Sequence, residues 1–245
     1  MNDAIYRLGT ISVYGFGVLA TISFLWGSFV FYKKAVSSHL DEFHILDGVV
    51  MSAFWAFMVG RLSYVILNLD IFWNRFSRVF LFSNFPGIDK WGVLVGIFLG
   101  AFWTVRRVKG KVFDWFDLIS LGISSGIAIL FAGLSALRFS WQYLVLSLIY
   151  LLFFIFSWGA EDKYRTFGWY KGNKTSSRSG LITGLSISVW GMLSILEESF
   201  FNNMDFNKVM WGILLIVGGM VLVYIRSGRT VSEDIKIIFK NGRKK

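Results

Sequence analysis

An arginine lies inside a long apolar stretch of this sequence, and a cation in such a place can bind an anion. Arg61 is the only charged residue between Asp47 and Asp70. The stretch 47–70 is long enough to cross a bilayer at about 1.5 Å per residue. A charged side chain in a membrane helix is costly and usually faces the protein interior or a wet cavity. Because Arg61 lies in the second half of the stretch, its guanidinium also has the reach to extend to lipid headgroups, so both interpretations stay open.

Two other polar side chains stand at the ends of apolar stretches. Tyr14 precedes Gly15 near the start of the first stretch, and Glu198 follows Glu197 at the end of a later one. The pattern alone favours an ordinary position for each of them. Tyr14 fits the aromatic belt at the membrane surface, and Glu198 fits a hydrated acid at a helix end.

The sequence predicts neither a metal site nor a bound cofactor. It contains no Cys, which excludes disulfides, a thiolate nucleophile and iron–sulfur centres. His39 and His44 lie close together in one loop, and two histidines without a third ligand make a poor metal site. The chain also lacks a phosphate-binding glycine loop.

The composition is that of a membrane protein with several spans. Hydrophobic residues make up 55% of the 245 positions and charged residues only 16%, which is too apolar for an ordinary soluble domain. The formal net charge is +10. Because the basic residues fall between apolar blocks, we expect anionic lipid headgroups as their partners and no nucleic acid.

The apolar blocks predict an all-α, polytopic bundle of about seven transmembrane helices in one domain, residues 1–245. Glycines recur every four residues at Gly92, Gly96 and Gly100, which favours close packing against another helix. The segment 71–86 is too polar to cross and resembles an interfacial amphipathic segment. The predicted spans lie near residues 10–32, 47–69, 91–105, 118–137, 141–158, 181–196 and 209–225.

Seven spans place the two termini on opposite sides of the membrane, and the distribution of basic residues indicates the orientation. Of the 25 Lys and Arg residues, 18 fall on the side of the C-terminus and 6 on the side of the N-terminus. By the positive-inside rule the N-terminus is outside and the C-terminus is cytoplasmic. This orientation puts Arg75, Arg138 and Glu198 toward the outer face.

Several short motifs occur in a characteristic order. Residues 11–15 read Ile-Ser-Val-Tyr-Gly, and residues 59–65 read Val-Gly-Arg-Leu-Ser-Tyr-Val. Asn-Leu-Asp follows at 68–70, and then come a glycine-rich span, the basic turn 106–111, Asp117 and a second glycine-rich span. In this order the sequence resembles the bacterial phosphatidylglycerol–prolipoprotein diacylglyceryl transferases.

That resemblance implies a seven-helix enzyme of the bacterial cytoplasmic (inner) membrane. The family transfers diacylglyceryl from phosphatidylglycerol to the cysteine thiol of a lipobox. By resemblance, Tyr14 and Glu198 are catalytic and Arg61 lines the substrate site. Arg138 and Arg75 lie outside in the predicted topology, so we expect them to bind the substrate phosphate in place of family cations that this sequence lacks. The implied partners are phosphatidylglycerol or another anionic phospholipid and a prolipoprotein that bears a lipobox.

The sequence departs from the family at four polar positions. Trp91 stands at a His position, Phe131 and Ser194 at Arg positions, and Leu134 at an Asn position. Losing cations that stabilise a departing phosphate is expected to lower the rate severely. The alternative is therefore a non-catalytic protein that binds a lipid or an apolar peptide on the same fold. A small-solute transporter is less favoured because the sequence shows neither broken helices nor inverted repeats.

Overall fold

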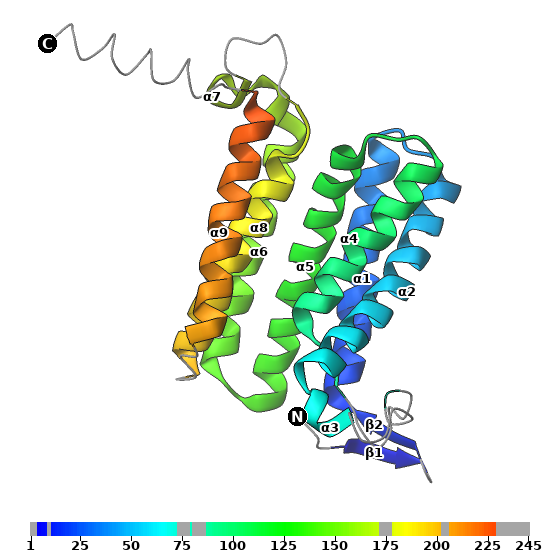
Figure 1. The fold of residues 1–245 in the computed structure, drawn as a ribbon, viewed down its shortest axis with the longest axis vertical. Helices are drawn as coiled ribbons and strands as arrows, with labels where there is room; N and C mark the ends of the chain where they lie inside the picture. The colour runs from blue at the N-terminus through cyan, green and yellow to red at the C-terminus, as the bar shows by residue number, and fades with distance from the viewer. Residues whose placement is uncertain are drawn as a thin grey trace, which may run out of the picture. The chain divides into compact units, whose positions relative to one another are not determined.

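A short β-hairpin precedes a series of helices in the computed structural model, which describes residues 4–8, 11–72, 79, 87–171, 178–201 and 206–228 (Figure 1). Strand β1 (Ala4–Leu8) pairs antiparallel with β2 (Ile11–Tyr14). Helix α1 (Gly15–Ser37) therefore begins five residues later than the predicted span. Residues with β-branched and aromatic side chains favour extended backbone where a partner strand is available, and hydropathy alone does not register that partner.

The rest of the described chain is helical, as predicted. Each of the six later predicted spans coincides with one long helix. The elements after α1 are α2 (Glu42–Leu67), α3 (Leu69–Phe72), α4 (Lys90–Arg107), α5 (Val112–Arg138), α6 (Trp141–Lys163), a 3-10 turn η2 (Tyr164–Thr166), α7 (Gly168–Lys171), α8 (Leu181–Phe200) and α9 (Phe206–Ser227).

Within the described residues, six helices are long and apolar enough to cross a membrane, namely α1, α2, α5, α6, α8 and α9. The protein is thus a multi-pass helical membrane protein. Helix α4 has 18 residues and carries Lys90, Arg106 and Arg107 at its two ends. A crossing by α4, and with it the predicted seven-span orientation, stays a prediction.

The chain folds into two compact units, which we describe separately: Met1–Phe116 (unit 1) and Asp117–Lys245 (unit 2). In unit 1, helices α2 and α4 lie backbone to backbone along a row of small residues. A Cβ added at Gly96 would lie 2.6 Å from the Cα of Ala56, and one added at Gly100 would lie 2.6 Å from the Cα of Ser52. The glycine spacing predicts close packing against another helix, and α4 packs in this way against α2. These close approaches fix the register of the antiparallel pair.

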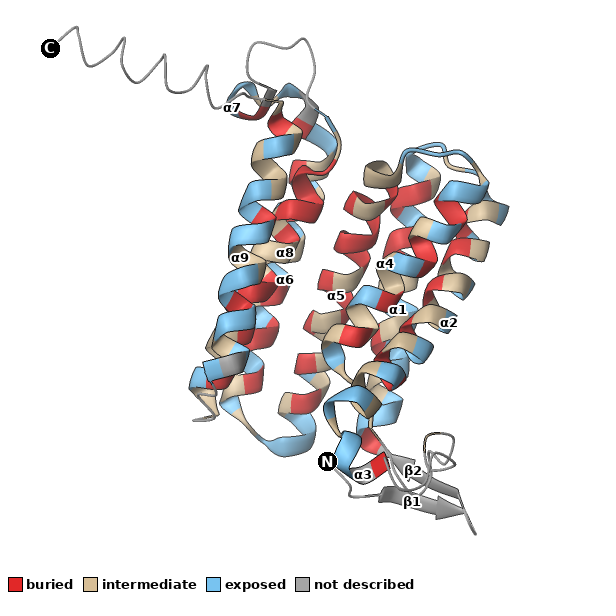
Figure 2. Ribbon diagram, in the orientation of Figure 1, coloured by how far each residue is buried: buried red, intermediate tan, exposed pale blue. Residues whose placement is uncertain are grey.

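Unit 2 uses the same device between α8 and α9. A Cβ added at Gly191 would lie 2.6 Å from the carbonyl oxygen of Gly212, and one added at Gly219 would lie 2.5 Å from that of Gly184. The opposite face of α9 stays exposed, with only 11% of its apolar window buried (Figure 2). In a membrane protein such a face is the one that contacts lipid.

Candidate functional site

Arg61 of α2 is turned into the protein. The residue is only 4% exposed. Its Nε donates to the carbonyl oxygen of Val79 at 3.1 Å, and its Nη1 donates to that of Gly87 at 2.9 Å. The guanidinium also lies over the rings of Tyr64 and Phe72, 5.7 and 5.3 Å from their centroids. Of the two interpretations left open by the sequence, this burial fits the inward-facing one.

The contacts of Arg61 give it a positioning role. Its two hydrogen bonds hold the connection between α3 and α4 to the C-terminal part of α2, because Val79 and Gly87 both lie in that connection. Gly87 packs closely enough that a Cβ there would collide with the ring of Tyr64. Arg75 belongs to the same connection but lies outside the described residues. Substrate binding by Arg61 and Arg75 stays a prediction.

A second cation, Arg138, lies at the C-terminal end of α5 in unit 2. Its Nη1 donates to the hydroxyl oxygen of Tyr143 at 2.8 Å, and its guanidinium carbon lies 5.6 Å from the centroid of that ring. Tyr143 in turn contacts Phe201, with ring centroids 4.8 Å apart. Arg138 itself is exposed, so a guanidinium held in a defined place remains accessible to an anion.

Glu198 lies close to the same end of unit 2, one turn before Phe201 on α8. Its Oε2 accepts from Nζ of Lys208 on α9 at 3.1 Å. The carboxylate side chain is only 10% exposed, whereas the Lys208 side chain is 52% exposed. Glu198 is therefore a buried, paired carboxylate and not the hydrated acid that the sequence pattern alone favoured.

Arg138, Tyr143, Glu198, Phe201 and Lys208 together form what we call the Arg138–Glu198 end of unit 2. Trp141 and Phe200 extend its aromatic part, with ring centroids 5.6 Å apart. Two cations, one carboxylate and several rings at the ends of four helices suit a charged lipid headgroup with its acyl chains alongside.

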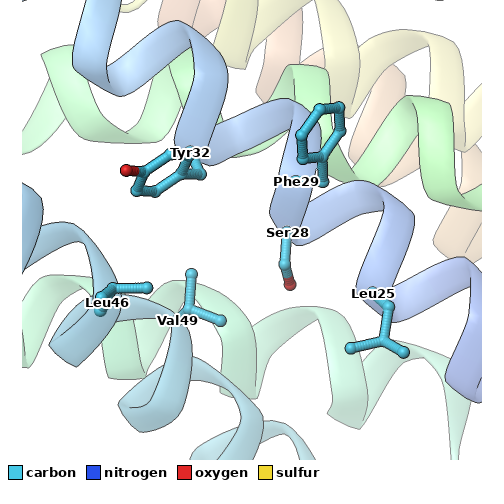
Figure 3. A pocket seen from close by; sticks show the side chains of 6 residues that line it. All are labelled: Leu25, Ser28, Phe29, Tyr32, Leu46 and Val49. Carbon is cyan, nitrogen blue, oxygen red and sulfur yellow. The ribbon is translucent and has the colours of Figure 1, made fainter.

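Tyr14 is the last residue of β2, and its side chain lies outside the part of the structure that is described. Its predicted catalytic role therefore stays a prediction. A shallow hollow lies elsewhere in unit 1, between α1 and α2 (Figure 3). Its lining is uncharged and mainly apolar, so it lacks the chemistry for a phosphate: Leu25, Ser28, Phe29, Tyr32, Leu46 and Val49.

Aromatic packing occupies the α5 position where the family resemblance expects an arginine. Phe131 is 9% exposed and stacks on both Tyr143 and Tyr150, with centroids 6.0 and 5.6 Å away and rings inclined by 21° and 23°. Leu134, one turn later, is 6% exposed. On α8, the Ser194 hydroxyl donates to the carbonyl of Gly191 at 2.8 Å, within its own helix.

Asp117 is a buried carboxylate that sequence reasoning used only as a landmark. It is 2% exposed and accepts three hydrogen bonds at the start of α8: from the backbone N–H of Gly180 at 2.7 Å, and from the N–H and Oγ1 of Thr183 at 2.8 and 2.6 Å. The sequence signal that could have identified Asp117 is an acidic residue at the start of an apolar span. Its partners, more than sixty residues away, have no local signature.

Tyr170 lies near this carboxylate in the α6–α8 connection. Its hydroxyl donates to the carbonyl of Arg178 at 2.9 Å. Burial raises the pKa of Tyr170, and the negative charge of Asp117 raises it further, while Arg226 lowers it. The phenol therefore stays neutral and remains a donor. These hydrogen bonds hold the start of α8 in place. We therefore assign Asp117 and Tyr170 a structural role and do not treat them as a second candidate site.

Comparison with known proteins bears on unit 1 and on the first part of unit 2. A sequence model of the family described as prolipoprotein diacylglyceryl transferase matches residues 3–133. The phosphatidylglycerol–prolipoprotein diacylglyceryl transferase of Bartonella quintana (strain Toulouse) is 28% identical over 141 residues, which cover 53% of this chain and 47% of that protein. Proteins of the same name from Thermoanaerobacter sp. (strain X514) and Serratia proteamaculans (strain 568) are each 25% identical, over 49% and 51% of this chain and 47% and 44% of their own length.

The chain thus spans about half the length of the curated relatives it matches. The family match includes Tyr14, Arg61 and Arg75 and ends before Arg138 and Glu198. The geometry of the Arg138–Glu198 end is therefore independent of that match.

Proposed function

Since this chain belongs to the prolipoprotein diacylglyceryl transferase family, we propose that it binds phosphatidylglycerol and transfers the diacylglyceryl group only slowly. The proposed acceptor is the family's, the cysteine thiol of a lipobox-bearing prolipoprotein. Family membership, together with the six long apolar helices of the described residues, makes the protein a multi-pass component of the bacterial cytoplasmic membrane.

The reaction has defined chemical requirements. The thiol proton passes to a base, and the sulfur forms a bond to the carbon of the diacylglyceryl group that is esterified to the phosphate. The bond from that carbon to the phosphate oxygen breaks, and glycerol phosphate leaves. Cations near the phosphate stabilise the departing charge, and a positioned carboxylate can take the proton. At the Arg138–Glu198 end, Arg138 has the first property and Glu198 the second.

Lipid binding is supported by the geometry of Arg138. Tyr143 fixes its guanidinium through one N–H and the ring face, and among the described residues no carboxylate lies within ion-pair distance of it. A fixed, exposed guanidinium suits the oxygens of a phosphate diester. The neighbouring Trp141 and Phe200 rings suit the interfacial level at which headgroups lie.

Slow transfer is supported by one observation above all: Phe131 is stacked between Tyr143 and Tyr150. An aromatic stack provides apolar surface but no donor for a developing phosphate charge. Removing one such donor typically costs about 10²–10³ in rate. By the family resemblance, Trp91 and Ser194 also stand at polar positions, so we expect the rate to fall well below that of the family's active members.

The test measures lipid binding and transfer on one preparation. The full chain is reconstituted in nanodiscs that contain phosphatidylglycerol and phosphatidylcholine, and a lipobox peptide with one cysteine is added. Native mass spectrometry is expected to show retained phosphatidylglycerol. Thioether-linked product is expected to form at a small fraction of the rate of the Serratia proteamaculans transferase under the same conditions. A comparable rate would refute slow transfer, and equal retention of both lipids would refute specific binding.

A non-catalytic lipid- or apolar-peptide-binding protein is the second candidate, and the same aromatic stack favours it. Complete absence of thioether product, together with retained phosphatidylglycerol or bound peptide, would select this function.

A further inference from the structure

Three serine hydroxyls in the core of unit 2 are buried and have no role in the proposed function. Ser120 of α5, Ser157 of α6 and Ser186 of α8 are each fully buried, at 0% exposure. Within the described part of the chain, their Oγ atoms make no hydrogen bond. A buried hydroxyl without a partner is costly in protein and more so inside a bilayer, where water does not compensate for it.

Two hydrogen bonds between α5 and α8 place Ser120 and Ser186 at the same level. Asp117 of α5 accepts from Thr183 of α8, and Ser124 of α5 accepts from Nε1 of Trp190 of α8 at 3.3 Å. Ser120 lies three residues after Asp117 and four before Ser124. Ser186 lies three residues after Thr183 and four before Trp190. Each serine is therefore midway between the same two contacts, on the facing sides of parallel helices.

Ser157 reaches this level from α6. Ala160, one turn away on the same helix, packs in one cluster with Leu121 and Ile182, which adjoin the Ser120 level on α5 and the Thr183 contact on α8. Further along, the Ser147 hydroxyl donates to the carbonyl of Ala128 on α5 at 2.8 Å. Ser157 lies between these two contacts on α6, nearer the Leu121 cluster. This register places the three buried serines near one level of the three helices.

We infer that Ser120, Ser157 and Ser186 together bind one buried water molecule in the core of unit 2. A hydroxyl both donates and accepts, so a single water can satisfy all three, and buried waters typically make about three such bonds. The site has no charge of its own. The nearest acid along α5, Asp117, already accepts three hydrogen bonds from Gly180 and Thr183, which favours water over a metal cation.

The direct test is a crystal or cryo-EM structure of the full chain at a resolution that shows ordered waters. Density for one water in contact with all three Oγ atoms is expected. Hydroxyls turned onto carbonyls of their own helices, with no density between them, would overturn the inference. A peak whose binding depends on Na⁺, seen as a thermal midpoint that rises with Na⁺ but not with choline, would also overturn it.

Stability measurements test the inference independently, through the direction in which each Ser→Ala change moves the thermal midpoint. If each hydroxyl lacks a partner, Ser→Ala removes an unsatisfied group and raises the thermal midpoint in detergent. If the three share a water, each single Ser→Ala change lowers the midpoint, because two remaining hydroxyls lose a ligand. The triple variant then recovers most of the loss, since no polar group is left unsatisfied. Single changes that are neutral or stabilising, or that add up in the triple variant, contradict the inference.

Ser125→Ala is the matched control. Ser125 lies on α5 and is 2% exposed, but its hydroxyl donates to the carbonyl of Gly122 within its own helix. Its effect is expected to add to that of any of the three substitutions, because it does not share their water. Since each single change removes only one oxygen, all four variants are expected to fold.

Discussion

The hydroxyl oxygen of Tyr143 accepts a hydrogen bond from Nη1 of Arg138 at 2.8 Å, while the same ring lies beneath the guanidinium. The two contacts fix both the position and the plane of the cation. A flexible exposed arginine would lose conformational entropy on binding a phosphate, and this one has lost part of it in advance.

Arg138→Gln is expected to weaken phosphatidylglycerol retention by up to about fivefold, since an exposed ionic contact contributes about 1 kcal/mol or less. Tyr143→Phe keeps the ring and removes only the acceptor, so a smaller loss is expected. Both are measured by native mass spectrometry against phosphatidylcholine. Arg107→Gln, at the exposed end of α4, is the charge-matched control. Equal losses in Arg107→Gln and Arg138→Gln would show that net charge, not this site, retains the lipid.

Arg61→Gln is expected to destabilise unit 1. The shorter side chain does not span to the carbonyls of both Val79 and Gly87, which are half-buried. Losing the donor of each is expected to cost about 1 kcal/mol, less than for a fully buried carbonyl. Thermal unfolding in detergent measures the effect. Arg107→Gln again serves as the exposed comparison and is expected to change stability by about 0.5 kcal/mol or less. An unchanged midpoint in Arg61→Gln would contradict the positioning role.

Gly96→Val is expected to separate α2 from α4, because even a Cβ there would lie 2.6 Å from the Cα of Ala56. Loss of monodisperse protein, or a strongly lowered thermal midpoint, is the expected readout. Gly159→Ala is the control, since a Cβ at that position meets no atom within 4 Å. It lies inside helix α6, where Ala is favoured over Gly by roughly 0.5–1 kcal/mol, so a neutral or stabilising effect is expected.

Asp117→Asn is expected to loosen the first turn of α8. The amide keeps one oxygen acceptor, but it replaces a charge-assisted contact to Thr183 and Gly180 with a weaker neutral one. Loss of an N-terminal cap typically costs about 0.5–2 kcal/mol. Faster hydrogen exchange confined to the first turn of α8 is the expected signature. Protection that is unchanged there would indicate that the backbone alone holds this helix start.

The helices and their packing face were predictable because their signal is local. An apolar block long enough to cross a bilayer has few alternatives to a helix, and the spacing of Gly92, Gly96 and Gly100 specifies a face without reference to its partner. Strand β2 escaped prediction because Ile11–Tyr14 reads as the start of an apolar span, and only its pairing with β1 makes it extended.

The site was less predictable because its contacts join residues far apart in the chain. No pattern around Arg61 indicates that Val79 and Gly87 receive its N–H groups, or that Lys208 pairs with Glu198. The family resemblance placed Glu198 among the functional residues. It did not indicate that Phe131 would be stacked between two tyrosines.

The hydrogen bonds of Asp117 have a consequence for biosynthesis. The carboxylate lies at the start of α5, and its three donors lie at the start of α8, so a ribosome makes the acceptor more than sixty residues before the donors. Until α8 is made, these three hydrogen bonds to Asp117 are missing, and the N-terminal part of α5 is expected to stay near the aqueous boundary. Because synthesis of Gly180 and Thr183 supplies these donors, we expect α5 to reach its final depth in the membrane only after α8 has been made.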